Sequence, residues 1–312
     1  MTLRVLAFVA VLFTAASAHA GYLLVEGRRV EVPFHVVHSL CDFADVARWA
    51  ALPDPTRTAA KPREGDAGPE DDEPRTGPWY RGSVDWTGYV RPRETCRGTP
   101  PEAQDEGDAD ALAAWRKAHC VPLDARKGVR LVVLHASRTN DAASLVVRLA
   151  ERGLSTHLAI DWDGTVYQLA DLGLATFHAS GFNDVSVGVH LVNPMQDLRG
   201  APGGARDPVL ARHGQERSVV TERIHGADVT STGPTAAQVE SLTALSRALV
   251  SVFPSVARRV PRDAAGRLLR TELASPSRAS GFVGHFHLAT ARRDPGPGID
   301  WEGLEEAIAP AH

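Results

Sequence analysis

The pattern of apolar and polar residues changes at Val129. The sequence VRLVVLH that begins there has a continuous apolar centre, from Leu131 to Leu134, and ends on the polar residue His135. A short unbroken apolar run predicts a strand that is buried on both faces of a sheet. We therefore expect a central strand at this point, with His135 at its end.

A helix and a pair of strands are predicted next. Asn140 or Asp141 can cap the helix, and Gly153 is its expected end. The segments HLAID and TVYQL then predict two strands, and the Asp163-Gly164 pair between them is a strong hairpin signal. The two strands should therefore pair antiparallel.

A further strand is predicted over SVGVHLV, residues 186–192. Side chains alternate along a strand, so two distinct faces are expected. One face carries Val187, Val189 and Leu191, and the other carries Ser186, Gly188 and His190. His190 therefore shares its face with a residue that has no side chain.

The chain then passes through a long irregular stretch into a second helix. Residues 194–233 are rich in glycine, proline and arginine and predict a long surface insertion. Thr235 and Gln238 form a capping-box pattern, which predicts that a helix starts here. Apolar residues at helical spacing support this helix: Val239, Leu242, Leu245, Leu249 and Phe253.

The predicted elements occur in the order strand, helix, hairpin, strand, helix. This order favours an α/β fold of α+β-like character, in which a mixed central β-sheet is flanked by helices. We expect one domain, residues 128–312, to contain it.

The N-terminal part is predicted to form separate segments. Residues 1–20 have an early arginine, an apolar run and an Ala-His-Ala ending, which is typical of a cleaved secretory signal. Residues 53–78 are rich in proline, glycine and charge and predict a flexible linker. This linker separates a short segment, residues 21–52, from an irregular extension with tryptophans and cysteines, residues 79–127.

Charge and targeting limit the partners. The apolar run in residues 1–20 is too short for a membrane anchor, so we expect a secreted or periplasmic protein. The net charge of the chain is −4, and loss of Arg4 with the signal lowers it by one, to −5. Nucleic acid is therefore not an expected partner.

The three cysteines permit one disulfide and leave one thiol. Cys96 and Cys120 would close the shortest loop, but spacing leaves all three pairings open. In HVVHSLC, steps of three residues would place His35, His38 and Cys41 on one face of a helix. Without a fourth ligand nearby, a disulfide role for Cys41 is favoured over metal binding.

Candidate chemistry occurs at both ends of the main domain. A histidine at the end of a buried strand is usually structural. Together with Asp294, however, His135 and His285 are candidate zinc ligands. Two imidazoles and one carboxylate leave the fourth position of a tetrahedral zinc open for water. Asp294 precedes a Pro-Gly-Pro turn, whose constrained backbone can aim the carboxylate. His287 stays an alternative to His285, since two residues along an extended segment share a face.

From about Val129 to Leu304, the chain resembles the zinc-dependent type 2 N-acetylmuramoyl-L-alanine amidases, which share their fold with peptidoglycan recognition proteins. The resemblance lies in motifs that occur in the order of the family. These motifs are VVLHAS, LSTHLAIDWDGTVYQLADL, FHASGFNDVSVGVHLVN, PTAAQVESLTALSRAL, and GH with DPGPGIDW.

The resemblance implies a function and a set of site residues. It implies a Zn²⁺ site formed by His135, His285 and Asp294, and its Gly-His pair favours His285 over His287. It also implies that Thr156, His178 and Asn183 contact the substrate, which would be peptidoglycan or a muropeptide. The expected reaction is hydrolysis of the amide between N-acetylmuramic acid and L-alanine by metal-activated water, carried out by a monomer.

The chain departs from the family at the expected catalytic groups. Many members have a glutamate at the position of His190, a lysine where this chain has Arg292 and Arg293, and some have a tyrosine at the position of Thr156. A neutral His190 can accept a proton from water, since its unperturbed pKa is about 6.5. The arginines can stabilise an oxyanion. A peptidoglycan-binding protein without turnover, or a zinc hydrolase for another amide, are the alternatives.

Overall fold

The computed structural model describes residues 21–41, 90–98, 108–137, 139, 141–193 and 217–310. The predicted signal over residues 1–20 and the predicted linker over residues 53–78 lie outside these ranges, and so does Asn140, one of the two expected helix caps. None of the helices within the described ranges is both long and apolar enough to cross a membrane.

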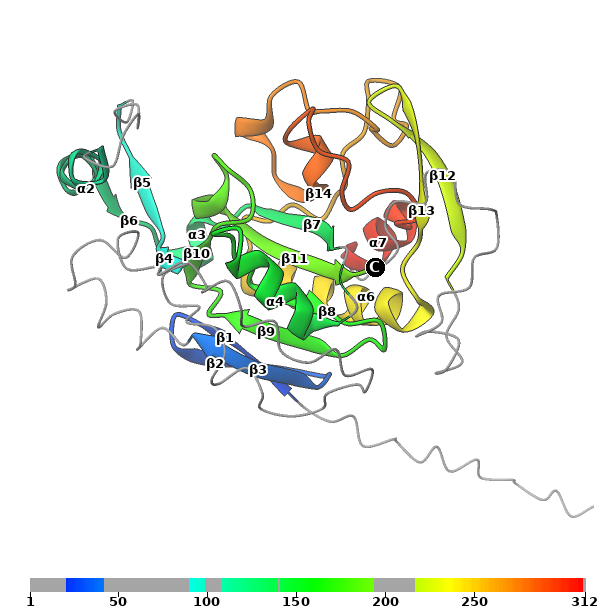
Figure 1. The fold of residues 1–312 in the computed structure, drawn as a ribbon, viewed down its shortest axis with the longest axis horizontal. Coiled ribbons are helices and arrows are strands. Elements are labelled where there is room, and N and C mark those ends of the chain that lie inside the picture. Colours follow the sequence, from blue (N-terminus) through cyan, green and yellow to red (C-terminus); the bar gives the residue numbers. More distant parts are fainter. Residues whose placement is uncertain are drawn as a thin grey trace, which may run out of the picture.

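A six-stranded mixed sheet forms the centre of the fold (Figure 1). Its order is β14 (Gly281–Gly284), β7 (Leu131–Ser137), β11 (Ser186–Val192), β8 (Leu158–Ile160), β9 (Val166–Ala170) and β3 (Val36–Cys41). The first four strands are mutually parallel, β8 and β9 are antiparallel, and β9 is parallel to β3. The mixed sheet confirms the expected fold class.

Helices cover both faces of this sheet (Figure 1). On one face, α6 (Ala236–Val252) and α7 (Trp301–Ile308) pack against the strands, and α4 (Ala142–Ala150) packs on the other. Val187, Val189 and Leu191 of β11 belong to the core cluster that includes α6 and α7. Ser186, Gly188 and His190 therefore point to the opposite face, as the alternation predicted.

Local signals explain where the helices begin. Asp141 caps α4, and its carboxylate accepts a hydrogen bond from the backbone N–H of Ser144. Thr235 and Gln238 form the predicted capping box at the start of α6. The hydroxyl of Thr235 also donates to the carbonyl oxygen of Trp162 at 2.7 Å, so it ties the helix to the loop between β8 and β9.

The predicted hairpin has a longer turn than expected. Ile160 pairs with Val166, so five residues separate β8 from β9 rather than the three residues, Trp162 to Gly164, between the predicted strands. Gly164 has φ of 87°, which other residues rarely adopt. The antiparallel pairing itself is as predicted.

Residues 194–233 were expected to be a long surface insertion, and the stretch from Val219 to Thr232 within it has regular secondary structure that was not predicted. There, β12 (Val219–Ile224) and β13 (Ala227–Thr232) form an antiparallel hairpin. Positive φ angles at His225 (51°) and Gly226 (77°) give the tight turn that suits a two-residue hairpin loop. The turn lacks the usual Asn-Gly or Asp-Gly pair, which is why the pattern did not reveal it.

The N-terminal segments pack on the same core instead of standing apart. β1 (Gly21–Val25) and β2 (Arg28–Val32) form a hairpin, and β3 is the edge strand of the central sheet. Leu23, Val25 and Val36 belong to the main buried cluster. The interpretation of His35, His38 and Cys41 as one helical face is wrong, because β3 is extended, and His38 stacks on Tyr22.

The extension before the main domain is also ordered around short strands. Its elements are β4 (Val90–Pro92), β5 (Glu94–Cys96), α2 (Asp108–His119), β6 (Cys120–Pro122) and α3 (Ala125–Gly128). β4 pairs with β10 (Leu174–Thr176), and β5 pairs with β6. Three short 3-10 turns complete the described elements: Asn183–Val185, Pro276–Arg278 and His285–His287.

The disulfide joins Cys96 to Cys120, with an S–S distance of 2.06 Å. The shortest of the three pairings left open by spacing is therefore the one that forms. Because the chain has three cysteines, this pairing is not the one expected for Cys41 within the chain.

Replacement of Thr235 by alanine tests the anchoring of α6. Thr235→Ala removes the cap and the hydrogen bond from Thr235 to the Trp162 carbonyl, so the free energy of unfolding should fall by about 1–2 kcal/mol. Chemical denaturation measures the change. Thr235→Ser keeps the hydroxyl and should lie much closer to the wild type; equal losses in both variants would contradict this role.

Candidate metal centre

The parallel strands place the predicted ligands at one edge of the sheet. β7 is parallel to β11 on one side and to β14 on the other. His135 and His190 are direct register partners on β7 and β11, and β14 ends at Gly284, immediately before His285. Because these strands run in the same direction, their carboxyl ends bring the three histidines together.

Asp294 reaches the same place through the loop after His285. The backbone N–H of Phe286 donates to the carbonyl oxygen of Asp294 at 3.0 Å, which closes the loop onto itself. The N–H of Gly296 donates to the carbonyl oxygen of Arg293 at 2.9 Å, within the turn that contains Pro295. These bonds hold the Asp294 carboxylate beside His285.

Two imidazole nitrogens converge on a single carboxylate oxygen. Asp294 Oδ2 lies 3.0 Å from His135 Nδ1 and 3.1 Å from His285 Nδ1. The structure thus brings together all three residues that were expected to bind the metal.

A chain of hydrogen bonds determines which nitrogen of His135 carries the proton. The carbonyl oxygen of Phe182 can only accept, so the Ser186 hydroxyl donates to it at 2.7 Å. Ser186 Oγ then accepts from His178 Nε2 at 3.1 Å. His178 Nδ1 in turn accepts from His135 Nε2 at 3.0 Å. In neutral His135, Nδ1 is therefore the nitrogen with a free lone pair.

This tautomer places a lone pair of His135 against the Asp294 carboxylate. Two acceptors 3.0 Å apart repel each other unless a proton or a metal cation lies between them. Burial lowers the pKa of His135, although Asp294 opposes this, so the neutral ring is favoured over the protonated one. A metal cation between the two atoms would make this arrangement favourable.

The donor set and its spacing fit zinc. Zn²⁺ takes nitrogen and oxygen donors at about 2.0–2.2 Å, and tetrahedral angles then separate the donors by about 3.3 Å. The observed separations of 3.0 and 3.1 Å are close to this value. Three protein ligands leave one position for water or substrate, which is the arrangement of catalytic zinc sites.

Gly188 makes room for the histidine that orients His135. A Cβ atom on Gly188 would lie 2.7 Å from Cγ of His178 and 3.0 Å from Oγ1 of Thr156, closer than real side chains approach. Only glycine lets the His178 ring lie against β11. From the sequence, His178 was expected to contact the substrate. Its hydrogen bond to His135 was not predicted, because no local pattern around FHAS indicates it.

His190 lies against His135 from the neighbouring strand. The two rings stack with centroids 4.5 Å apart and an interplanar angle of 9°. Burial, followed by the neighbouring His135, holds the pKa of His190 well below its usual value. Its Nδ1 atom is buried without a hydrogen-bond partner in the described part of the chain.

A cleft of about 1070 Å³ opens over these residues. Its floor includes His135, His190 and His285. Arg148 and Arg152, from the end of α4 and just beyond it, line one part of the wall, and Arg292 and Arg293 line another. The first four residues of β13, 227–230, also line the cleft. Four arginines and two aspartates, Asp228 and Asp294, therefore line the cleft.

Arg292 and Arg293 differ in the hydrogen bonds that their side chains make. Arg293 donates to the carbonyl oxygens of Thr290 and Arg292, so its side chain is held by its own loop. The Arg292 side chain makes no hydrogen bond or ion pair with another described residue. Arg292 is therefore the better placed of the two to reach a group bound in the cleft.

The remaining predicted residues have different positions. His178 and Asn183 line the cleft, whereas Thr156 is fully buried and does not, because its hydroxyl donates to the carbonyl oxygen of Gly188 at 3.1 Å. His287 lies in a 3-10 turn rather than an extended segment. Its ring nitrogens contact the N–H of Gly284 and the carbonyl of Leu269, which makes it structural.

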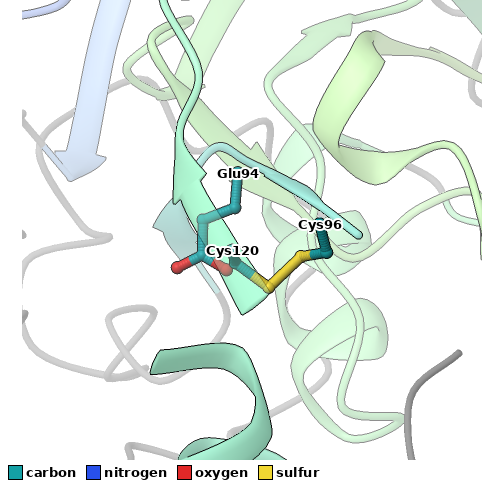
Figure 2. A group of neighbouring side chains, drawn as sticks. All are labelled: Glu94, Cys96 and Cys120. Atoms are coloured by element: carbon teal, nitrogen blue, oxygen red, sulfur yellow. A yellow bond between two sulfur atoms is a disulfide. The ribbon is translucent and has the colours of Figure 1, made fainter. Parts of the chain in front are cut away.

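A second group of donor side chains does not fit a metal. Figure 2 shows Glu94 beside Cys96 and Cys120, whose sulfur atoms are joined in the disulfide. Disulfide sulfurs are not thiolates and do not ligate zinc. Within the described residues, His135, His285 and Asp294 are the set that can hold a cation.

Comparison with known proteins identifies the family of the chain. A family model for N-acetylmuramoyl-L-alanine amidase matches residues 124–297, more than half of the chain. The chain belongs to the N-acetylmuramoyl-L-alanine amidase family. No curated protein matches it.

Several solved structures are similar at low identity. The endolysin amidase LysCS from Clostridium intestinale URNW is 16% identical, with 60% of this chain and 88% of that chain covered and a TM-score of 0.35. AmpDh3 from Pseudomonas aeruginosa, in complex with anhydromuramic pentapeptide, is 20% identical, with 58% and 60% covered and a TM-score of 0.38. Drosophila peptidoglycan recognition protein SA is 15% identical, with 58% and 79% covered and a TM-score of 0.30.

Replacement of Gly188 tests the orientation of His135. Gly188→Ala should displace the His178 ring and remove its hydrogen bond to His135, so zinc affinity should fall by about 10- to 100-fold. Competition with a chromophoric chelator measures the affinity. Gly233→Ala is the matched control, since its Cβ would meet no atom closer than 3.7 Å. Unchanged affinity in Gly188→Ala would exclude the orienting role of His178.

Proposed function

We propose that the protein is a zinc-dependent hydrolase that cleaves the amide bond between N-acetylmuramic acid and L-alanine in peptidoglycan. The observation that carries the proposal is the convergence of His135 Nδ1 and His285 Nδ1 on Asp294 Oδ2 at the floor of the cleft. Membership of the amidase family supports the choice of substrate and bond.

His135, His285 and Asp294 would hold the metal. A bound Zn²⁺ would polarise the scissile carbonyl and acidify the attacking water. The protein supplies the orientation: Ser186 and His178 keep His135 in the tautomer that leaves Nδ1 free, and the closed loop after His285 holds the carboxylate. Such outer contacts raise metal affinity and limit ligand motion.

His190 is the proposed general base. It is the imidazole of the cleft that is neither a proposed ligand nor hydrogen-bonded to one, and it lies directly against His135. In this position its ring can accept a proton from the attacking water and return it to the departing amine. Arg292 is the proposed cationic group that stabilises the oxyanion formed from the carbonyl.

The proposed substrate also explains the proposed location. Peptidoglycan lies outside the cytoplasm, and residues 1–20 have the pattern of a secretory signal. We therefore propose a secreted or periplasmic enzyme that acts as a monomer on peptidoglycan or its muropeptide fragments. The positive wall of the cleft suits the carboxylates of a peptide substrate.

A second candidate function follows from the same site. This chain has His190 where many family members have glutamate, and arginines where they have lysine. A protein of this fold that lost its base would still present the cleft and bind peptidoglycan without cleaving it. The two functions differ in turnover, and experiments on the full chain distinguish them.

The first experiment identifies the bond that is cleaved. Zinc-loaded protein incubated with purified peptidoglycan should release stem peptides that begin with L-alanine and leave the glycan strands intact. Mass spectrometry identifies the fragments. Removal of the metal with a chelator should abolish release, and added Zn²⁺ should restore it. Zinc-loaded protein that binds peptidoglycan and releases nothing would support the binding function instead.

Replacement of His190 tests the proposed base. His190→Gln keeps a polar side chain but cannot accept the proton, so kcat should fall by about 10²–10⁴-fold while zinc content stays at one per chain. Steady-state rates and metal analysis measure the two effects. His190→Glu restores the residue common in the family and should keep measurable activity. Full activity in His190→Gln would contradict the assignment.

A further inference from the structure

Residues 90–98 and 108–123 form a disulfide-closed unit that lies before the family-matched region, which starts at residue 124. We call it the clip. Figure 1 shows α2, β5 and β6 projecting from one side of the molecule, whereas β4 lies against the domain beside β10. The clip therefore has a projecting part and a part that contacts the domain.

The contacting part inserts an arginine into the domain. Arg93 is only 2% exposed and is the largest fully buried side chain of the described residues. Its guanidinium donates to the carbonyl oxygens of Leu172, Asn183 and Asp184, at 2.8–3.3 Å. Burial lowers the pKa of Arg93 to about 9, against the effect of Asp184, so it keeps its charge at neutral pH. A buried charge needs all of these partners.

Two further contacts hold the turn Asn183–Val185. Arg91 forms a bidentate ion pair with Asp184, with both N–O distances 2.5 Å. The backbone N–H of Glu94 also donates to Asp184 Oδ1 at 2.9 Å. In addition, β4 pairs with β10, and Thr176 opposite Val90 is the last residue of that pairing. The clip thus holds both ends of the segment from Thr176 to Asp184.

That segment carries the residue that orients the proposed ligand. Asn183 Oδ1 accepts hydrogen bonds from the backbone N–H groups of His178 at 3.1 Å and Ala179 at 2.8 Å. His178 in turn contacts His135 Nε2. A continuous path of contacts therefore runs from Arg93 through Asn183 and His178 to His135.

Contacts within the clip also stabilise it. The Cys96–Cys120 disulfide joins β5 to β6, and Figure 2 shows it beside Glu94. Glu94 forms an ion pair with Arg116 of α2, at 2.8 Å. The backbone N–H of Leu123 donates to the carbonyl oxygen of Arg93 at 2.9 Å. These contacts fix the backbone on both sides of the inserted arginine.

We propose that the clip is a positioning device for the metal site, in which Arg91 and Arg93 hold the Asn183 turn and thereby keep His178 against His135. The proposal rests on the metal site of the proposed function. It assigns a role in metal binding to residues outside the family-matched region, and it makes Arg91, Arg93 and Asp184 positioning residues rather than catalytic ones.

The test removes the negative charge of Asp184 and keeps the size of its side chain. Asp184→Asn has the same size but loses the ion pair with Arg91. In the full chain, zinc affinity measured by chelator competition should fall by about 10- to 100-fold. The visible spectrum of the Co²⁺-substituted protein should also change, because it reports the geometry of the ligands. Both are measured well below the thermal midpoint, so that loss of stability alone does not affect them.

The matched control is Asp263→Asn, which breaks the exposed ion pair with Arg267. It should retain wild-type zinc affinity and Co²⁺ spectrum. If Asp184→Asn does not fold, Arg91→Gln replaces it, since this side chain is partly exposed, and the same results are expected.

Wild-type affinity and spectrum in the folded Asp184→Asn or Arg91→Gln variant would overturn the proposal and leave the clip as a purely stabilising unit. This result is distinct from failure of the proposed function, in which the wild-type protein itself binds no zinc.

Discussion

The contact between His135 Nδ1 and Asp294 Oδ2, 3.0 Å apart, is the constraint on which the site depends. The carbonyl of Phe182 starts a series of hydrogen bonds through Ser186 and His178 that leaves this nitrogen without a proton. A lone pair is thereby directed at a carboxylate, which is unfavourable without a cation. The fold thus places two hydrogen-bond acceptors in contact, and a metal ion bound between them would remove their repulsion.

The rest of the structure maintains that contact. Parallel strands β7, β11 and β14 bring the histidines to one edge, and Gly188 leaves room for the ring of His178. The loop bond between Phe286 and Asp294 fixes the carboxylate. Burial of the polar side chains around His135 costs free energy, and their hydrogen bonds to one another offset this cost. His190 Nδ1 is an exception, because it is buried without a hydrogen-bond partner among the described residues.

The sequence predicts the elements whose signals are local. The apolar run at Leu131–Leu134 and the capping box at Thr235 give β7 and α6, because burial on both faces and the first turn of a helix leave a direct pattern. The hairpin at His225-Gly226 was missed, since an αL turn can form without the usual residues. The place of β3 in the sheet was missed as well, because strand pairing across more than a hundred residues leaves no local signal.

The candidate site also depends on contacts between distant segments, which local sequence patterns do not predict. The convergence of His135, His285 and Asp294 was expected from the resemblance to a family, and no spacing in the sequence alone gives it. The roles of Ser186, Gly188 and Arg93 depend on contacts between distant segments. They become visible only when side-chain positions are known.

The most direct test of the account is the protonation of His135 in the metal-free protein, measured by long-range ¹H–¹⁵N correlation of the histidine side chains. We expect a neutral ring with the proton on Nε2, and an unprotonated Nδ1 whose ¹⁵N resonance shifts when one equivalent of Zn²⁺ is added. A proton on Nδ1 shared with Asp294 would contradict it, because the pair would then be satisfied without a metal.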